Sequence, residues 1–527
     1  MRTACLAKVA LAPVLGAALV MISVAPALAQ ITQVQVTGGT VAGTVADGVA
    51  SFKGIPFAQP PLGELRWRAP QPVKPWPGVR KATRFGPACM QAPGLAHRMA
   101  PGVALSEDCL YVDVWTAAGS PGERRPVIAW IYGGGFTGGM TSAPLYDGAN
   151  FARRGVVFVS LSYRVGALGF LATPELSRES GQASGNYGLL DQIAGLKWIQ
   201  ANIARFGGDP SKVTLLGHSA GGFSVSMLAG SPLARGLFRG VISESGANFM
   251  PPQDSAWGGG SIQTLRLAQS AGQAWLAGLG ARTLAQARAL PAEKLVAAQG
   301  VRGAPRFWPP VDGYVITGDQ YRLWRQGRFN DTPILVGDVS DEAAAFGVHE
   351  TDPAAFEAQV RHGYGKEADA LLAVYPHATA EQATRSATQL RSDTTFDWGQ
   401  YTWARLQSAH GRHRAYVYWF DRPSARDPNG SGHGQEVGYV FGNLGVGGRA
   451  QPTAQDQALS QRMQAYWVNF AMHGDPNGPG LPAWPAFTAS RPLVMRFGVN
   501  PGPAPIPNQD RLKVLDDYYA WRRAGGH

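Results

Sequence analysis

Apolar runs rich in β-branched residues recur along the chain and predict buried parallel strands. Segments with helical periodicity lie between them. In the clearest one, apolar residues recur at three- and four-residue spacing from Leu190 to Ile203, and the pattern ends before Gly207 and Pro210. This alternation predicts an α/β fold, in which helices cover both faces of a mostly parallel central sheet. The predicted strands are Val127–Tyr132, Val156–Tyr163, Val213–Leu216, Gly240–Ser243, Thr332–Val336 and Ala415–Phe420.

The pattern near the N-terminus is different. Val34, Val36, Val41 and Val45 alternate with small or polar residues, which predicts an antiparallel hairpin on the edge of the sheet. We find no internal repeat and no long linker between the predicted elements. We therefore expect residues 30–527 to form a single domain.

The first 29 residues have the pattern of an export signal. Arg2 and Lys8 supply positive charge, an apolar stretch follows, and Ala27-Leu28-Ala29 fits a cleavage site before Gln30. The alternative is an uncleaved membrane anchor, but the stretch is shorter than the ~20 residues that a span requires. We expect residues 1–29 to be removed and the mature protein to be secreted or periplasmic.

The overall composition excludes several classes of protein. The chain has 527 residues, of which 45% are hydrophobic, so it can bury a large core and is not disordered. Its formal net charge is +11, but the arginines are scattered along the chain. Nucleic-acid binding requires a basic patch or stripe, so we do not expect it. The oligomeric state does not follow from the sequence.

The chain has three cysteines, and Cys5 is lost with the predicted signal. Cys89 and Cys109 remain, which is an even number in an oxidising compartment, so we expect one disulfide bond. Two buried free thiols are the alternative. Two cysteines are too few for a structural zinc or iron–sulfur site.

The sharpest chemical motif is Gly217-His218-Ser219-Ala220-Gly221, which follows a predicted strand and precedes a segment able to start a helix. A serine on such a tight turn is exposed above the sheet, and the N–H of the next residue points toward a developing oxyanion. The motif predicts that Ser219 is a nucleophile. A serine hydroxyl is a poor nucleophile, so it requires a nearby base and a third group to orient that base.

A second motif, Tyr132-Gly133-Gly134-Gly135-Phe136, also follows a predicted strand. Consecutive glycines let successive backbone N–H groups turn toward one point, so we expect Gly134, Gly135 and Ala220 to form an oxyanion hole. The same segment spells G-x-G-x-x-G from Gly133 to Gly138, which raises an NAD-dependent oxidoreductase as an alternative. That fingerprint should open a helix, and the residues that follow are poor helix formers.

Four further segments occur in order along the chain: Phe52–Ala58, Ser106–Leu110, Asn186–Gln192 and Phe206–Pro210. Together with the serine and glycine motifs, they resemble the type-B carboxylesterase family of α/β-hydrolases, which includes cholinesterases and bacterial para-nitrobenzyl esterases. The resemblance covers nearly all of the mature chain. It implies an α/β-hydrolase fold, hydrolysis of small carboxylic esters through an acyl-enzyme and no cofactor. The pairing of Cys89 with Cys109 resembles the family's first disulfide loop.

The resemblance and the order of the triad residues assign the other catalytic groups. Glu342, in the loop after a predicted strand, matches the family's acid, with Asp341 as the nearest alternative. His433 matches the family's histidine loop. The sequence His433–Glu436 lacks the second histidine of an H-E-x-x-H zinc site, so we expect no catalytic metal. By the same resemblance, Ser245 lies behind the triad, and two ion pairs are expected to be structural: Arg66 with Glu107, and Arg164 with Asp191.

Positions at which the sequence departs from the family limit the range of possible substrates. His218 stands where cholinesterases have a glutamate, and the segment between the two cysteines contains no Phe, Trp or Tyr to bind a choline head. Choline esters are therefore disfavoured. We take Phe249, Phe307 and Trp308 as candidates for pocket walls, with core packing as the alternative, and Arg302 and Arg306 beside them permit an ester of a polyacid. A catalytically inactive adhesion module of the same fold is the other functional alternative, although all three triad positions are filled.

Overall fold

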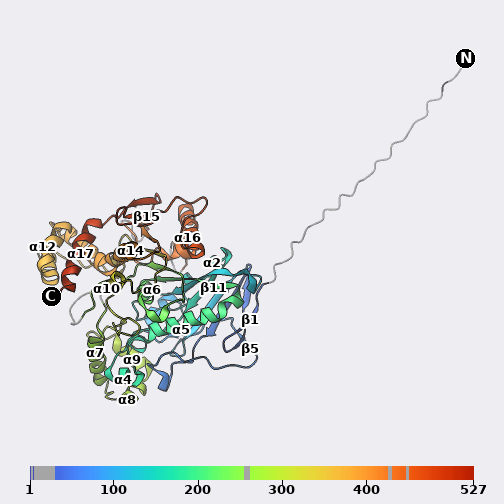
Figure 1. Ribbon diagram of the computed structural model, residues 1–527, viewed down its shortest axis with the longest axis horizontal. Helices are drawn as coiled ribbons and strands as arrows, with labels where there is room; N and C mark the ends of the chain where they lie inside the picture. The colour runs from blue at the N-terminus through green and yellow to red at the C-terminus, as the bar shows by residue number, and fades with distance from the viewer. Residues whose placement is uncertain (2–3, 5–29, 254–261, 425–429, 447–449, 527) are drawn as a thin grey trace.

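The computed structural model describes residues 1, 4, 30–253, 262–424, 430–446 and 450–526 (Figure 1). Almost all of the predicted export signal therefore lies outside the described residues. Within the described part of the chain, no helix is both long and apolar enough to cross a membrane.

A large central sheet organises the structure. Its strand order is β16-β15-β14-β13-β12-β11-β9-β10-β8-β4-β3, and every neighbouring pair from β15 to β10 is parallel. The strands at both edges are antiparallel. The strands are β3 (Thr44–Ala46), β4 (Val49–Pro56), β8 (Tyr111–Thr116), β9 (Arg125–Ile131), β10 (Val157–Leu161), β11 (Gly208–His218), β12 (Gly240–Glu244), β13 (Ile334–Val339), β14 (Ala415–Phe420), β15 (Leu493–Phe497) and β16 (Gly502–Pro505).

Helices cover both faces of this sheet, as predicted. On one face, α2, α15 and α16 pack around Trp130 and Phe158, and on the other face α5, α6 and α14 pack against the strands. The helices are α1 (Pro93–Met99), α2 (Ala149–Arg153), α3 (Gly166–Phe170), α4 (Pro174–Ser180), α5 (Tyr187–Asn202), α6 (Ala220–Gly230), α7 (Leu265–Gly278), α8 (Leu284–Arg288), α9 (Ala292–Gln299), α10 (Gln320–Arg325), α11 (Pro353–Tyr364), α12 (Ala368–Val374), α13 (Ala380–Ser392), α14 (Trp398–His410), α15 (Val437–Phe441), α16 (Ala454–His473) and α17 (Gln509–Arg523).

The six strands predicted from apolar runs correspond to β9 through β14, and the predicted α/β fold is confirmed. The antiparallel edge is also present, as β3, β4 and β8. Val34, Val36 and Val41 lie elsewhere, however: β1 (Gln33–Val36) and β2 (Gly39–Ala42) pair with β5 (Val79–Lys81) in a separate three-stranded sheet. A tight turn pairs β1 with β2, so these two strands are not part of the central sheet. Of the predicted hairpin, only the segment that contains Val45 lies at the edge of the central sheet, as β3.

The sequence patterns missed β8, which carries a charged residue in a fully buried position. Asp113 accepts a hydrogen bond from the Gly54 N–H at 2.7 Å, and burial raises its pKa to about 6. A carboxyl group that accepts a backbone hydrogen bond can be buried at a tolerable free-energy cost. A search for apolar runs does not find such a strand, because the aspartate interrupts the run.

The expected disulfide and ion pairs are present. Cys89, in the short strand β6 (Ala88–Cys89), is bonded to Cys109 across a separation of 20 residues. Closing a loop of this length stabilises the fold by about 3 kcal/mol in the chain-entropy description. Nε of Arg66 donates to Glu107 at 2.7 Å, and Nε of Arg164 donates to Asp191 at 2.7 Å.

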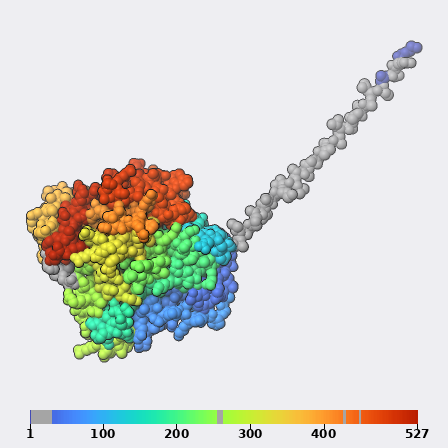
Figure 2. Space-filling model, in the orientation of Figure 1, coloured from blue at the N-terminus to red at the C-terminus, as the bar shows by residue number. Residues whose placement is uncertain are grey.

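Figure 2 shows how the chain is arranged over one face of the molecule. The N-terminal segments (blue) and the C-terminal segments (red) lie at opposite sides of this face, and the middle of the chain lies between them. The strands that end in the candidate site are β9, β11, β12, β13 and β14, so they come from widely separated parts of the chain.

Candidate active site

The candidate site residues follow the carboxyl ends of neighbouring parallel strands. The glycine loop follows β9, Ser219 follows β11, Ser245 follows β12, Glu342 follows β13 and His433 follows β14. The register aligns these ends: His218 lies opposite Glu244, and Gly217 lies opposite Ile131. Because parallel strands all point the same way, loops far apart in sequence meet at one edge of the sheet.

Ser219 lies on a sharp turn between β11 and α6. Its φ is 57° and its ψ is −124°, a conformation that a residue with a side chain rarely adopts. The turn fits only because its neighbours are small: a Cβ on Gly221 would lie 1.9 Å from the carbonyl oxygen of Ile131. The Ser219 N–H donates to the Glu244 carbonyl at 2.9 Å, which ties the turn to β12. The serine is partly exposed on this sharp strand-to-helix turn, which is the setting that a serine nucleophile requires.

The loops after β13 and β14 bring a carboxylate to an imidazole. Oε2 of Glu342 contacts Nδ1 of His433, and Oε1 of Glu342 accepts the Val339 N–H at 3.0 Å. Glu342 is fully buried, and 9% of the His433 side chain is exposed. Nε2 of His433 is also buried and forms no hydrogen bond to any described residue, Ser219 included. The carboxylate can therefore orient the ring, and Nε2 is left to exchange a proton.

Asp341, the alternative acid, has a different place. Its N–H donates to the Ser431 carbonyl at 2.9 Å, and it forms a backbone bridge to Gly432. It thus links the loop that carries the acid to the loop that carries the histidine. The structure brings the carboxylate of Glu342, its neighbour, to His433.

The histidine loop also packs against the serine turn. The rings of His218 and His433 have centroids 4.6 Å apart, and a Cβ on Gly434 would lie 3.0 Å from the His218 ring. Nε2 of His218 lies 3.8 Å from Oε1 of Glu436. Ser245, which has a φ of 51°, donates its hydroxyl to the same oxygen at 3.4 Å.

Glu436 was not identified from the sequence. It is fully buried, and its carboxylate joins Ser245 and His218 behind the serine turn. The sequence feature that could have identified it is its spacing of three residues from His433. Where a helix begins, residues three positions apart lie on the same side of the chain. Glu436 is the residue that precedes α15.

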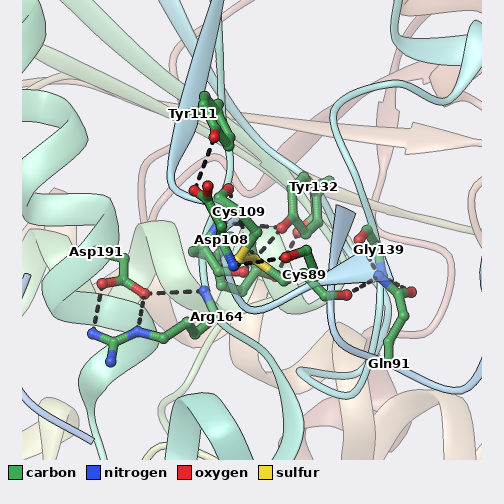
Figure 3. The surroundings of a disulfide bond; sticks show 11 residues. Cys89, Gln91, Asp108, Cys109, Tyr111, Tyr132, Gly139, Arg164 and Asp191 are labelled. Atoms are coloured by element: carbon green, nitrogen blue, oxygen red, sulfur yellow. Dashed lines mark hydrogen bonds and ion pairs between the residues drawn. A yellow bond between two sulfur atoms is a disulfide. The ribbon is translucent and has the colours of Figure 1, made fainter. Parts of the chain in front are cut away.

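The glycine loop is braced from the side of the disulfide (Figure 3). Gln91 is fully buried; its side-chain amide donates to the Gly139 carbonyl at 2.8 Å and accepts the Gly139 N–H at 2.9 Å. Gly134 and Gly135 have φ values of 123° and 62°, which a glycine adopts readily. Turns follow this loop directly, and the next helical residues begin only at Pro144, so the glycines do not open the helix that a dinucleotide-binding fingerprint requires.

The three aromatic candidates lie in different clusters. Phe249 is fully buried against Trp324 and Trp403, with ring centroids 5.1 and 5.8 Å away, and Phe307 packs on Trp275 at 4.8 Å. Trp308 is partly exposed. It contacts Phe136 of the glycine loop at 5.2 Å and Phe223 of α6 at 5.7 Å, so among the three it packs on the segments that flank Ser219.

Several buried carboxyl groups surround the site. Burial raises the pKa of Asp338 well above its usual value, and nearby Glu342 raises it further. Burial and the neighbouring Asp338 similarly raise the pKa of Asp397. Burial raises the pKa of Glu244 to about 8, although the indole N–H of Trp467 donates to it at 2.8 Å. A protonated carboxyl group carries no charge, so these acids can be buried without counter-ions.

No cluster of three or more potential ligands for a metal ion occurs among the described residues. The groups assembled at the sheet edge are instead a hydroxyl, an imidazole, a carboxylate and backbone amides. Such a set supports nucleophilic acyl transfer.

The raised pKa of Glu244 predicts a pH dependence of stability. The folded state holds this proton up to about pH 8, whereas the unfolded chain releases it near pH 4.5. The stability that the bound proton contributes is therefore complete below pH 4.5 and is lost as the pH rises through about 8. Glu244→Gln cannot ionise. Its free energy of unfolding in urea should exceed that of the wild type by a margin that grows between pH 4.5 and 8. The exposed Glu175→Gln serves as the control, and an equal, constant margin for both variants would contradict the assignment.

Comparison with known proteins identifies the family. The model of the carboxylesterase family matches residues 30–514. The chain is 36% identical to the fumonisin B1 esterase of Sphingopyxis macrogoltabida, over 88% of this chain and 86% of that protein. It is 34% identical to the para-nitrobenzyl esterase of Bacillus subtilis, over 85% and 91% of the two chains. A solved PNB esterase structure superposes with a TM-score of 0.81 and 31% identity, over 92% of this chain and 99% of that one. The chain belongs to the carboxylesterase family and is a serine carboxylesterase.

Proposed function

We propose that the enzyme hydrolyses carboxylic esters of small molecules with Ser219 as nucleophile, His433 as general base and Glu342 as the acid that orients it. The observation that carries the proposal is the buried contact between Glu342 and His433. The His433 ring packs against His218, the residue before Ser219. This arrangement supports a triad built from three separate loops, and it favours a hydrolase over an inactive adhesion module.

The proposed reaction has two steps. In the first, Nε2 of His433 takes the Ser219 proton as Oγ attacks the ester carbonyl, and the backbone N–H groups of Gly134, Gly135 and Ala220 stabilise the oxyanion. His433 then returns the proton to the leaving alcohol. In the second step, water attacks the acyl-enzyme with His433 again as base, which releases the acid and restores Ser219.

Throughout this cycle Glu342 stabilises the positive charge on His433 and holds its Nδ1. The contact between Glu342 and the Val339 N–H supports this role, because it fixes the carboxylate from behind. Ser245, Glu436 and His218 form a connected group next to the triad and support the placement of the serine turn.

Substitution of the nucleophile tests the proposal directly. Ser219→Ala should lower kcat for p-nitrophenyl butyrate about a million-fold, because the acyl-enzyme can no longer form. The exposed Ser180→Ala is the matched control and should retain activity. A serine-directed phosphonate should label the wild type on Ser219 and leave the Ser219→Ala variant unlabelled. Equal turnover by the Ser219→Ala variant and the wild type would refute the role of Ser219.

The two neighbouring carboxylates provide a second test. Glu342→Gln keeps the shape of the side chain but removes its charge, so the imidazole loses its orienting partner and kcat should fall about 10,000-fold. Asp341→Asn should reduce kcat far less, because the backbone hydrogen bond that ties it to the histidine loop remains and Glu342 still contacts His433. If the Asp341 variant shows the larger loss, the acid has been misassigned.

We further propose that residues 1–29 direct export and are removed, and that residues 30–527 form one catalytic domain. The match of the family model from residue 30 supports this boundary. The disulfide supports an oxidising compartment, where such bonds persist.

Expression in a bacterium with a periplasm tests the export proposal. N-terminal sequencing of protein recovered from the periplasm or the medium should begin at Gln30, since cleavage follows Ala29. Protein recovered only from the cytoplasm, still carrying its first residues, would contradict it.

A further inference from the structure

A continuous row of aromatic rings connects the glycine loop to the catalytic histidine. Ring centroids along it are 5.2 Å apart between Phe136 and Trp308, and 5.7 Å between Trp308 and Phe223. They are 6.3 Å apart between Phe223 and Phe396, and 4.7 Å between Phe396 and His433. Phe346 stacks on Phe396 at 6.0 Å and also contacts His433 at 5.0 Å. We call these five residues the aromatic row: Phe136, Trp308, Phe223, Phe396 and Phe346.

The row lies beside the groups that are proposed to react. Phe136 directly follows Gly135, and the Phe223 N–H donates to the carbonyl of Ser219 at 2.9 Å. Phe136, Phe223 and Phe396 are buried, whereas Trp308 is partly exposed and Phe346 is 47% exposed. A substrate held at Ser219 therefore meets the row only at Trp308 and Phe346, the two rings that reach solvent, and the three buried rings between them hold those rings in place.

An arginine stacks on each of these two accessible rings. The guanidinium of Arg306 lies 3.4 Å from the centroid of the Trp308 ring, and that of Arg391 lies 5.5 Å from the centroid of the Phe346 ring. Stacking on an aromatic face holds a guanidinium in place and leaves its edge of N–H donors free to bind an anion. Desolvation lowers the pKa of Arg306 to about 10, so it stays charged at neutral pH.

In the part of the chain that the structure describes, no acidic side chain pairs with either guanidinium. Among the described residues, Arg306 and Arg391 form no hydrogen bond and no ion pair through their side chains. The two buried arginines Arg66 and Arg164, by contrast, are paired: Arg66 binds Glu107, and Arg164 binds Asp191. Arg302 is exposed and does not stack on the row. Two unpaired cations at the solvent-accessible ends of an aromatic row favour a bound anion, and a planar carboxylate matches the fork of a guanidinium.

We propose that Arg306 and Arg391 select carboxylic esters that carry a free carboxylate group, such as the half-esters of dicarboxylic acids. The apolar part of the substrate packs on Trp308 or Phe346, the accessible rings of the row, and its carboxylate binds the guanidinium stacked on that ring while its ester group lies at Ser219. The positive net charge of the chain also attracts such anions. This inference rests on the proposed function of Ser219, and it adds the class of substrate.

A pair of matched esters tests the inference. Monoethyl adipate carries one carboxylate, and diethyl adipate carries none; release of ethanol gives kcat/KM for each. The measured quantity is the ratio of the two values. Arg306→Gln and Arg391→Gln should each lower this ratio about tenfold, as expected when a hydrogen bond between charged groups is lost. In the wild type, roughly 1 M salt should also lower it, because the Debye length is then about 3 Å.

The control reproduces the same local interaction away from the row. Arg80 lies on β5 in the small N-terminal sheet and stacks on Trp76 at 5.1 Å, so Arg80→Gln removes a stacked guanidinium and should leave the ratio unchanged. If both arginine variants retain the wild-type ratio, or lose activity on the two esters equally, the inference is wrong. A ratio that is insensitive to salt also overturns it.

The two proposals fail in different ways. If Ser219→Ala still hydrolyses diethyl adipate at the wild-type rate, the proposed nucleophile is wrong, whatever the arginine variants do. If hydrolysis requires Ser219 but the ratio is the same in the wild type and in both arginine variants, only the assignment of the substrate class fails.

Discussion

The parallel pairing of β11, β12, β13 and β14 is the constraint on which the candidate site depends. Each of these strands is buried on both faces, and the register brings their carboxyl ends to one edge. The backbone hydrogen bonds of the sheet therefore determine where the serine turn, the acid loop and the histidine loop begin. Contacts between the loops complete the arrangement: Ser219 is tied to Glu244, and Asp341 is tied to Ser431.

The low polarity of the interior has two opposite effects near this edge. It raises the pKa of Asp338, Asp397 and Glu244, so that these carboxyl groups are buried as neutral acids. It also strengthens the interaction between Glu342 and His433, because charges that water does not screen attract each other more strongly. The neutral acids can lie close to Glu342 without competing for the imidazole, and the site retains one carboxylate in direct contact with His433.

The parts of the molecule that local patterns encode could be predicted from the sequence. Apolar runs identified β9 through β14, and a serine between glycines after a strand identified the turn at Ser219. Glu342 and His433 required a resemblance to a family, because nothing in the residues around them shows that loops 91 positions apart meet. The order of the motifs along the chain suggested that Glu342 and His433 act together, and the structure shows that they are in contact.

Other features depend on tertiary packing and had no local signal. Phe249 and Phe307 look like Trp308 in the sequence, yet they pack into separate clusters, because the direction of a side chain depends on the path of the backbone around it. Phe396 and Phe346 were missed for the same reason, although both contact His433. Glu436 had only a weak signal in its spacing from His433, and β8 was hidden by its buried aspartate.

The side chain of Gln91 connects the disulfide bond to the glycine loop. It lies two residues from Cys89, and it holds the far end of the glycine loop through both sides of Gly139 (Figure 3). The covalent cross-link thus lies beside the side chain that braces the glycine loop, and it also restricts the unfolded chain. An enzyme made where thiols stay reduced would lose the cross-link beside Gln91, so the compartment in which the chain folds bears on the bracing of the glycine loop as well as on stability.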